Sequence, residues 1–199
     1  MSNAFRIKRR QAKSFENANV YGELYYVIND RSFNFIYTNH SFPSGRSYVL
    51  AFGLEIAVSL EDGQLLGVTS YTNCDRWTIS TLLEPRAFVK SPLYIDKYRE
   101  MQCGAAHEIS GCSSDATQYL FDPTTGWFLV GTSQSSCAEE LTVCFASGCY
   151  AVLSDDTIQR VWLQPANWTN IAEFLRNTEN ECNKSTSHLD ILPSQKRLR

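Results

Sequence analysis

Residues 54–71, LEIAVSLEDGQLLGVTSY, carry the pattern that decides the fold. From Leu54 to Leu60, large apolar residues alternate with small or polar ones, which is the period of a strand with one buried face. Asp62 and Gly63 follow, and this dipeptide favours the positive backbone angles of a tight turn. Residues 65–71 then provide a second apolar run. The stretch therefore predicts a β-hairpin.

The first strand of this hairpin is predicted to start before Leu54. The alternation extends back to Leu50, so we expect one unbroken strand over 50–60 that covers the core with a single face. The residues expected on its apolar face are Leu50, Phe52, Leu54, Ile56, Val58 and Leu60.

Similar short apolar runs, separated by turn residues, recur along the chain and predict about ten strands. Hairpins are expected at 21–39 about Asn29-Asp30 and at 118–133 about 122–126, three strands at 140–165 with turns at 147–148 and 155–156, another strand at 77–82, and loops at 40–47 and 103–116. Residues 60–71 and 121–134 resemble each other, either as a duplicated half or as two similar hairpins.

Two segments have helical spacing instead. Ser91 and Pro92 suit a helix start, and Tyr94, Tyr98 and Met101 recur at helical intervals, so a short helix is predicted at about 92–103. A second helix is predicted at about 168–177. Its apolar face would carry Trp168, Ile171 and Leu175.

Together these elements predict a mainly β (α+β) fold of antiparallel sheets, sandwich- or barrel-like, with two short helices. We expect a single β-rich domain at 15–177. It would be preceded by a basic, flexible segment at 1–14 and followed by a polar, disordered tail at 178–199. The sequence does not indicate an oligomeric state.

The ends of the chain are basic and its middle is acidic. Residues 14–192 hold 10 basic and 21 acidic side chains, a net charge of −11, although the whole chain has a net charge of only −3. An acidic body repels the phosphates of nucleic acids, so we expect no nucleic-acid ligand and a basic protein partner. The alternative is that the acidity serves solubility alone.

No apolar run approaches the roughly 18 residues that cross a membrane, and the N-terminus lacks the apolar core of a secretory signal. We therefore expect a cytoplasmic protein without a membrane partner. In that compartment the seven cysteines would be reduced thiols.

No metal, cofactor or catalytic site is expected. The seven cysteines form no Cys-x-x-Cys pair, and phosphate-binding and hydrolase motifs do not occur. A cysteine-dependent enzyme stays open as the least favoured alternative. It would use Cys103 or Cys112 with His107 or His40, completed by Asp115.

Two hairpin stretches carry a resemblance: LEIAVSLEDGQLLGVTSYTNCDRWTISTLLEP at 54–85 and VLSDDTIQRVWLQP at 152–165. A strand ending in an acidic turn, an apolar strand with glycine and a tryptophan-bearing strand that reaches a proline resemble immunity proteins of contact-dependent growth inhibition and related bacterial polymorphic toxin systems. The resemblance implies a non-enzymatic cytoplasmic protein that binds and neutralises a cognate toxin domain. Many such toxins are basic nucleases, which an acidic body would complement.

On this reading the partner contacts are expected among paired acidic residues, two pairs of which fall in predicted turns. The candidates are Glu61, Asp62, Glu139, Glu140, Asp155 and Asp156. The alternative is a sheet protein that binds a small ligand in an aromatic cleft. That cleft would be lined by Tyr25, Tyr26, Phe33, Phe35 and Trp77.

Overall fold

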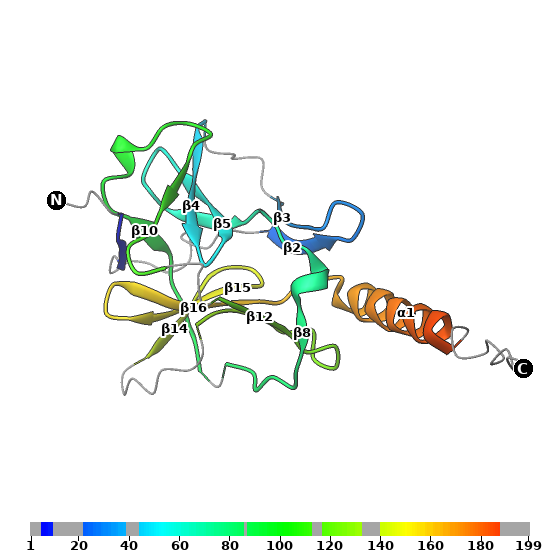
Figure 1. Cartoon of the computed structure of the whole chain (residues 1–199). Helices are drawn as coiled ribbons and strands as arrows, with labels where there is room; N and C mark the ends of the chain where they lie inside the picture. Colours follow the sequence, from blue (N-terminus) through cyan, green and yellow to red (C-terminus); the bar gives the residue numbers. More distant parts are fainter. Residues whose placement is uncertain are drawn as a thin grey trace, which may run out of the picture.

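The structure of the chain, a computed structural model, describes residues 5–9, 22–38, 44–85, 87–112, 117–132 and 140–187. Strands dominate it, and they form open, mainly antiparallel sheets accompanied by one α-helix (Figure 1). The predicted mainly β class is confirmed. None of the sheets in this described part closes into a barrel, because each ends in two different edge strands.

The largest sheet has seven strands in the order β8-β12-β13-β16-β15-β14-β9. Its five central strands are antiparallel, and the two short edge strands pair in parallel with their neighbours. The hairpin predicted at 118–133 and the three strands predicted at 140–165 are confirmed. The strand bounds are β8 Thr78–Ile79, β12 Gln118–Phe121, β13 Phe128–Gly131, β16 Thr157–Leu163, β15 Cys149–Ser154, β14 Leu141–Ala146 and β9 Val89–Lys90.

Three smaller sheets complete the fold. The hairpin predicted at 21–39 is confirmed as part of the three-stranded sheet. The four-stranded sheet contains β11 Ala106–Glu108, β4 Arg46–Ala51, β5 Leu54–Ser59 and β6 Leu65–Val68; the three-stranded sheet contains β2 Gly22–Val27, β3 Ser32–Tyr37 and β7 Ser70–Tyr71; and the two-stranded sheet contains β1 Ile7–Arg9 and β10 Leu93–Ile95.

The hairpin predicted from residues 54–71 is present, because β5 pairs antiparallel with β6. The unbroken strand over 50–60 is wrong. Phe52 (φ 55°) and Gly53 (φ 80°) form a turn between β4 and β5, which pair antiparallel across it. The Phe52 ring is buried, and the Tyr119 hydroxyl donates to the Phe52 carbonyl at 2.9 Å. These tertiary contacts hold a bulky residue in a backbone conformation that it rarely adopts.

The helix predicted at 92–103 is wrong. Leu93–Ile95 is a strand, β10, and a single 3-10 turn follows at Tyr98–Glu100. The segment is a strand because it pairs with β1, which is far away in the sequence. Ile7 of β1 is buried in the core. The basic segment expected to be flexible therefore contains a core strand. The loop predicted at 103–116 also contains a strand, β11, which pairs in parallel with β4.

The second helix is confirmed as α1 (Trp168–Ser187), and it is longer than predicted. Ile171 and Ala172 are buried, and Trp168 and Leu175 pack against the core. The helix continues through the first ten residues of the segment expected to be disordered, and residues 188–199 lie outside the described residues. No helix in the described ranges is long and apolar enough to cross a membrane.

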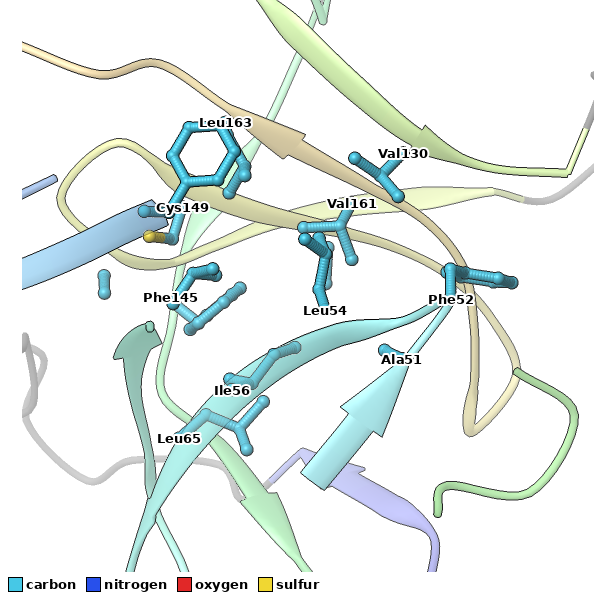
Figure 2. Close-up of a cluster of buried hydrophobic side chains, with 14 of the residues drawn as sticks. Ala51, Phe52, Leu54, Ile56, Leu65, Val130, Phe145, Cys149, Val161 and Leu163 are labelled. Carbon is cyan, nitrogen blue, oxygen red and sulfur yellow. The ribbon is translucent and has the colours of Figure 1, made fainter. Parts of the chain in front are cut away.

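The main core lies between the four-stranded sheet and the inner face of the seven-stranded sheet. Figure 2 shows Leu54, Ile56 and Leu65 of the smaller sheet facing the side chains of the larger one. The residues of the larger sheet labelled there are Val130, Phe145, Cys149, Val161 and Leu163. Because this packing fully covers the inner face, a site on the seven-stranded sheet has to use its outer face.

Candidate functional site

One connection crosses the outer face of the seven-stranded sheet. Residues 79–89, here called the strap, join β8 at one edge of the sheet to β9 at the other. The six inter-strand spacings between these edges amount to about 29 Å, and ten residue steps reach roughly 33 Å when extended. The strap is therefore long enough to span the sheet from edge to edge, and Figure 1 shows it passing below the sheet.

Beneath the strap lies a row of outward-facing side chains, one from each central strand. The register places them opposite one another in the order Leu120, Leu129, Trp162, Tyr150 and Cys144. Leu82 of the strap and Trp127 complete this small second core. Its aromatic rings meet edge to face, which is a favourable geometry, with centroids 5.2 Å apart for Trp127–Tyr150 and 5.9 Å apart for Trp127–Trp162.

Asp122 anchors the strap to the sheet. Its buried carboxylate accepts a hydrogen bond from the Leu82 backbone N–H at 2.9 Å and another from the Thr124 N–H at 2.8 Å. Burial works to raise the pKa of Asp122, but the backbone hydrogen bonds from Leu82, Thr124 and Thr125 outweigh it and hold the pKa below its usual value. The anchor is therefore a charged carboxylate at neutral pH.

A second row of residues leaves a hollow beside the strap. Gln118, Gly131 and Arg160 lie side by side on β12, β13 and β16, and Gly131 contributes no side chain between its two neighbours. The hollow has a volume of about 360 Å³. Its walls are Ser80, Thr81, Leu82, Leu83, Gln118, Leu120, Leu129, Gly131, Thr132, Arg160 and Trp162.

The strap also exposes apolar side chains to solvent. Leu83 is 72% exposed, Ile79 45%, Phe88 44% and Val89 42%. Of the seven large apolar side chains that are exposed in the described part of the chain, these four belong to one eleven-residue segment. They are spread along the strap from one edge of the sheet to the other, where a partner could cover them.

The predicted contact residues Glu61 and Asp62 both lie in the β5–β6 turn, and each carboxylate accepts a hydrogen bond. Glu61 accepts from the Ser44 N–H at 2.9 Å and from its hydroxyl at 3.0 Å, and these bonds lower the pKa of Glu61. Asp62 accepts from the Gln64 N–H at 3.0 Å. Asp62 therefore stabilises its own turn, whereas Glu61 ties this turn to Ser44, which precedes β4.

Asp155 and Asp156 form the exposed β15–β16 turn, and together with Arg6 and Ser110 they border a second hollow of about 310 Å³. Glu140 precedes β14 at the same end of the sheet, since Leu141 pairs with Leu153. Glu140 forms an ion pair with Arg160. Glu139 lies outside the described residues. The structure therefore groups Glu140 with Asp155 and Asp156, and it places the Glu61–Asp62 turn on a different sheet.

The aromatic cleft predicted as an alternative is not present. Tyr26, Phe33 and Trp77 are buried and pack on one another, with centroids 5.0 Å apart for Tyr26–Phe33 and 4.7 Å apart for Tyr26–Trp77. Phe35 is also buried, and the Tyr25 hydroxyl donates to Glu23. Tyr26, Phe33, Phe35 and Trp77 therefore fill the core, Tyr25 lies outside it, and none of the five lines either of the two hollows.

In the cysteine cluster considered above, His107 and Cys112 each have another neighbour. His107 is on β11 beside the Phe5 ring, whereas the Cys112 thiol donates to the Ile158 carbonyl at 3.4 Å. Burial raises the pKa of Cys112 to about 12, so this thiol is protonated at neutral pH. His40 and Asp115 lie outside the described residues. Among those that are described, no three His, Cys, Asp or Glu side chains are placed to hold a metal ion.

Sequence reasoning missed both the strap and Arg160. The available signal was the pair of apolar dipeptides Leu82-Leu83 and Phe88-Val89, which flank Pro85 in a segment without strand periodicity.

No protein-family model matches the chain, and no curated protein matches its sequence.

Proposed function

We propose that this chain binds a protein partner through the strap, and that it is a cytoplasmic immunity protein whose partner is a bacterial toxin domain. The toxin assignment rests on the resemblance of residues 54–85 and 152–165 to immunity proteins. The binding face rests on one observation, the four exposed apolar side chains of the strap.

The strap has the features of the centre of a protein interface. Apolar and aromatic side chains provide most of the binding energy of such a centre, and a polar rim surrounds it. Leu83 and Phe88 are the largest exposed groups of the strap. Both are held to the sheet nearby, since Leu82 packs in the second core and bonds to Asp122, and the Phe88 ring packs on Tyr150. Such anchoring reduces the conformational entropy that these side chains lose on binding.

The acidic residues are assigned a different role, which is to attract the partner electrostatically before it binds. Asp155 and Asp156 are exposed at one end of the sheet that the strap crosses, and they would attract a basic partner. Charges at a rim chiefly raise the association rate and its salt dependence. Glu61, Asp62 and Glu139 are kept as further candidates for this steering role. Glu140 is already paired with Arg160 and is the weakest candidate.

The test is affinity capture from a lysate of the source organism, with the partner identified by mass spectrometry. The wild-type protein is expected to retain one stoichiometric partner with a basic domain. A Leu83→Ser variant should lose that partner, because Leu83 is 72% exposed. Phe88 is left in place, since its ring packs edge to face on Tyr150 of the second core with centroids 5.1 Å apart. Ile36→Ser is the matched control, since Ile36 is 56% exposed on the three-stranded sheet.

Charge reversal separates the two parts of the proposal. Asp155→Lys with Asp156→Lys should slow association at low salt, and the dissociation rate should stay within about twofold. If the strap variant captures the partner as well as the wild type does, the proposed face is wrong. If no wild-type partner is found at low salt, the immunity function itself is wrong.

A further inference from the structure

We propose that the hollow beside Arg160 binds a small carboxylate that carries an apolar body. The argument for this site does not depend on the function proposed above, although Leu83 borders both the hollow and the exposed side of the strap. It combines a nearly buried cation, a wall of apolar side chains and an opening created by the missing side chain of Gly131.

The hollow is a consequence of the strand register. Gly131 lies between Gln118 of β12 and Arg160 of β16. A Cβ atom at position 131 would come within 2.8 Å of the Gln159 carbonyl oxygen and 2.9 Å of Arg160 Cγ. A side chain at position 131 would therefore collide with β16 and displace Arg160. Glycine lets Arg160 keep its place beside the hollow.

Arg160 has binding capacity that its present partner does not use. Its guanidinium carries five N–H donors, and the ion pair with Glu140 uses Nη2. Within the described part of the chain this is the one hydrogen bond that the guanidinium makes. The side chain is only 10% exposed, so the other donors meet little water outside the hollow. A planar carboxylate matches this donor geometry.

The walls define the rest of the ligand. Leu120, Leu129 and Trp162 form the sheet side, and Leu82 and Leu83 of the strap form the opposite side. Such walls favour an aromatic or branched apolar group next to the carboxylate. A volume of about 360 Å³ is near the lower end of the range for pockets that bind small molecules. Glu140 already balances one charge on Arg160, which favours a single carboxylate over a multiply charged anion.

The first experiment compares three probes by isothermal titration calorimetry on the full chain. The probes are 3-phenylpropanoate, its neutral amide 3-phenylpropanamide, and acetate. We expect 3-phenylpropanoate to bind at least about tenfold more tightly than the other two, because only it satisfies both Arg160 and the apolar walls. The proposal would be overturned if the amide bound as tightly as 3-phenylpropanoate. It would also be overturned if 3-phenylpropanoate did not bind at about 10 mM, a concentration that detects even weak binding.

Variants then locate the site. Gln118→Glu adds a negative charge to an exposed wall residue without changing its shape, and it should weaken 3-phenylpropanoate binding about tenfold or more. Gln102→Glu makes the same change at an exposed position that does not line the hollow, and it should leave binding unchanged. Arg160→Gln should abolish binding in a protein whose circular dichroism spectrum stays native. If Gln118→Glu and Gln102→Glu bind equally, the probe binds elsewhere and the proposal is wrong.

Discussion

The carboxylate of Asp122 accepts a hydrogen bond from the backbone N–H of Leu82 at 2.9 Å, and this contact fixes the strap to the sheet. The two residues are 40 positions apart in the sequence. Asp122 also caps its own turn through the N–H groups of Thr124 and Thr125. One buried charge therefore sets both the turn between β12 and β13 and the path of the segment that carries the proposed binding face.

Replacing this carboxylate by an amide should destabilise the protein. In Asp122→Asn one oxygen becomes an N–H donor that faces a backbone N–H group, and the charge-assisted bonds are lost. We expect the free energy of unfolding to fall by about 2–3 kcal/mol in urea denaturation. Asp156→Asn, the same change at an exposed turn, should alter it by less than about 0.5 kcal/mol.

The same residue predicts a pH dependence. Because the pKa of Asp122 is lower in the folded than in the unfolded protein, its stabilising contribution is fully present above the unfolded-state value of about 3.9. It is lost as the pH falls through the folded-state pKa. The stability difference between wild type and Asp122→Asn should therefore be constant from pH 5 to 7 and shrink below about pH 4. A difference that grows on acidification would contradict this account.

The turn at Phe52 and Gly53 offers a second stability test. Gly53 has a φ of 80°, and a Cβ atom there would come within 2.8 Å of the Tyr119 hydroxyl, which bonds to Phe52. Gly104 has a similar φ of 76° and open space around it. Gly104→Ala should cost about 1 kcal/mol of backbone strain, and Gly53→Ala about 1 kcal/mol more. Equal costs in urea denaturation would show that the Tyr119 contact adds nothing.

This turn also shows where sequence patterns stop being informative. The hairpins at 21–39, 54–71, 118–133 and 140–165 were predictable, because each has local turn residues between runs of period two. The turn at Phe52-Gly53 was not, since Phe52 continues the apolar alternation and only its contacts with the core and Tyr119 allow a positive φ. The helix predicted at 92–103 failed similarly. Its strand identity comes from pairing with Ile7–Arg9, which no local pattern reveals.

The candidate site was less predictable than the fold. Only the register of three strands makes neighbours of Gln118, Gly131 and Arg160. Gln118 and Arg160 are 42 positions apart in the sequence. The strap has no strand period of its own, so its position across the sheet follows from the pairing of β8 and β9 at opposite edges. Of the predicted acidic contacts, the sequence correctly indicated that the 61–62 and 155–156 pairs lie in turns.

The thiols provide a test that bears on the enzymatic alternative. Burial raises the pKa of Cys149 and of Cys112 to about 12, whereas Cys103 is exposed. Among the five cysteines whose side chains the structure describes, Cys103 should react first with iodoacetamide at pH 8, and Cys149 should react only after unfolding. Mass spectrometry of timed samples gives the order. Early modification of Cys112, or modification of Cys103 much faster than that of a free thiol, would favour a cysteine-dependent enzyme instead.

The most direct test of the proposed binding face is amide hydrogen exchange on the protein with and without its captured partner. Binding through the strap predicts slower exchange across residues 79–89 in the complex, with no change in the β2–β3 hairpin at 22–37. Unchanged exchange in the strap, with protection confined to another surface such as the Glu61–Asp62 turn, would contradict the assignment of this face.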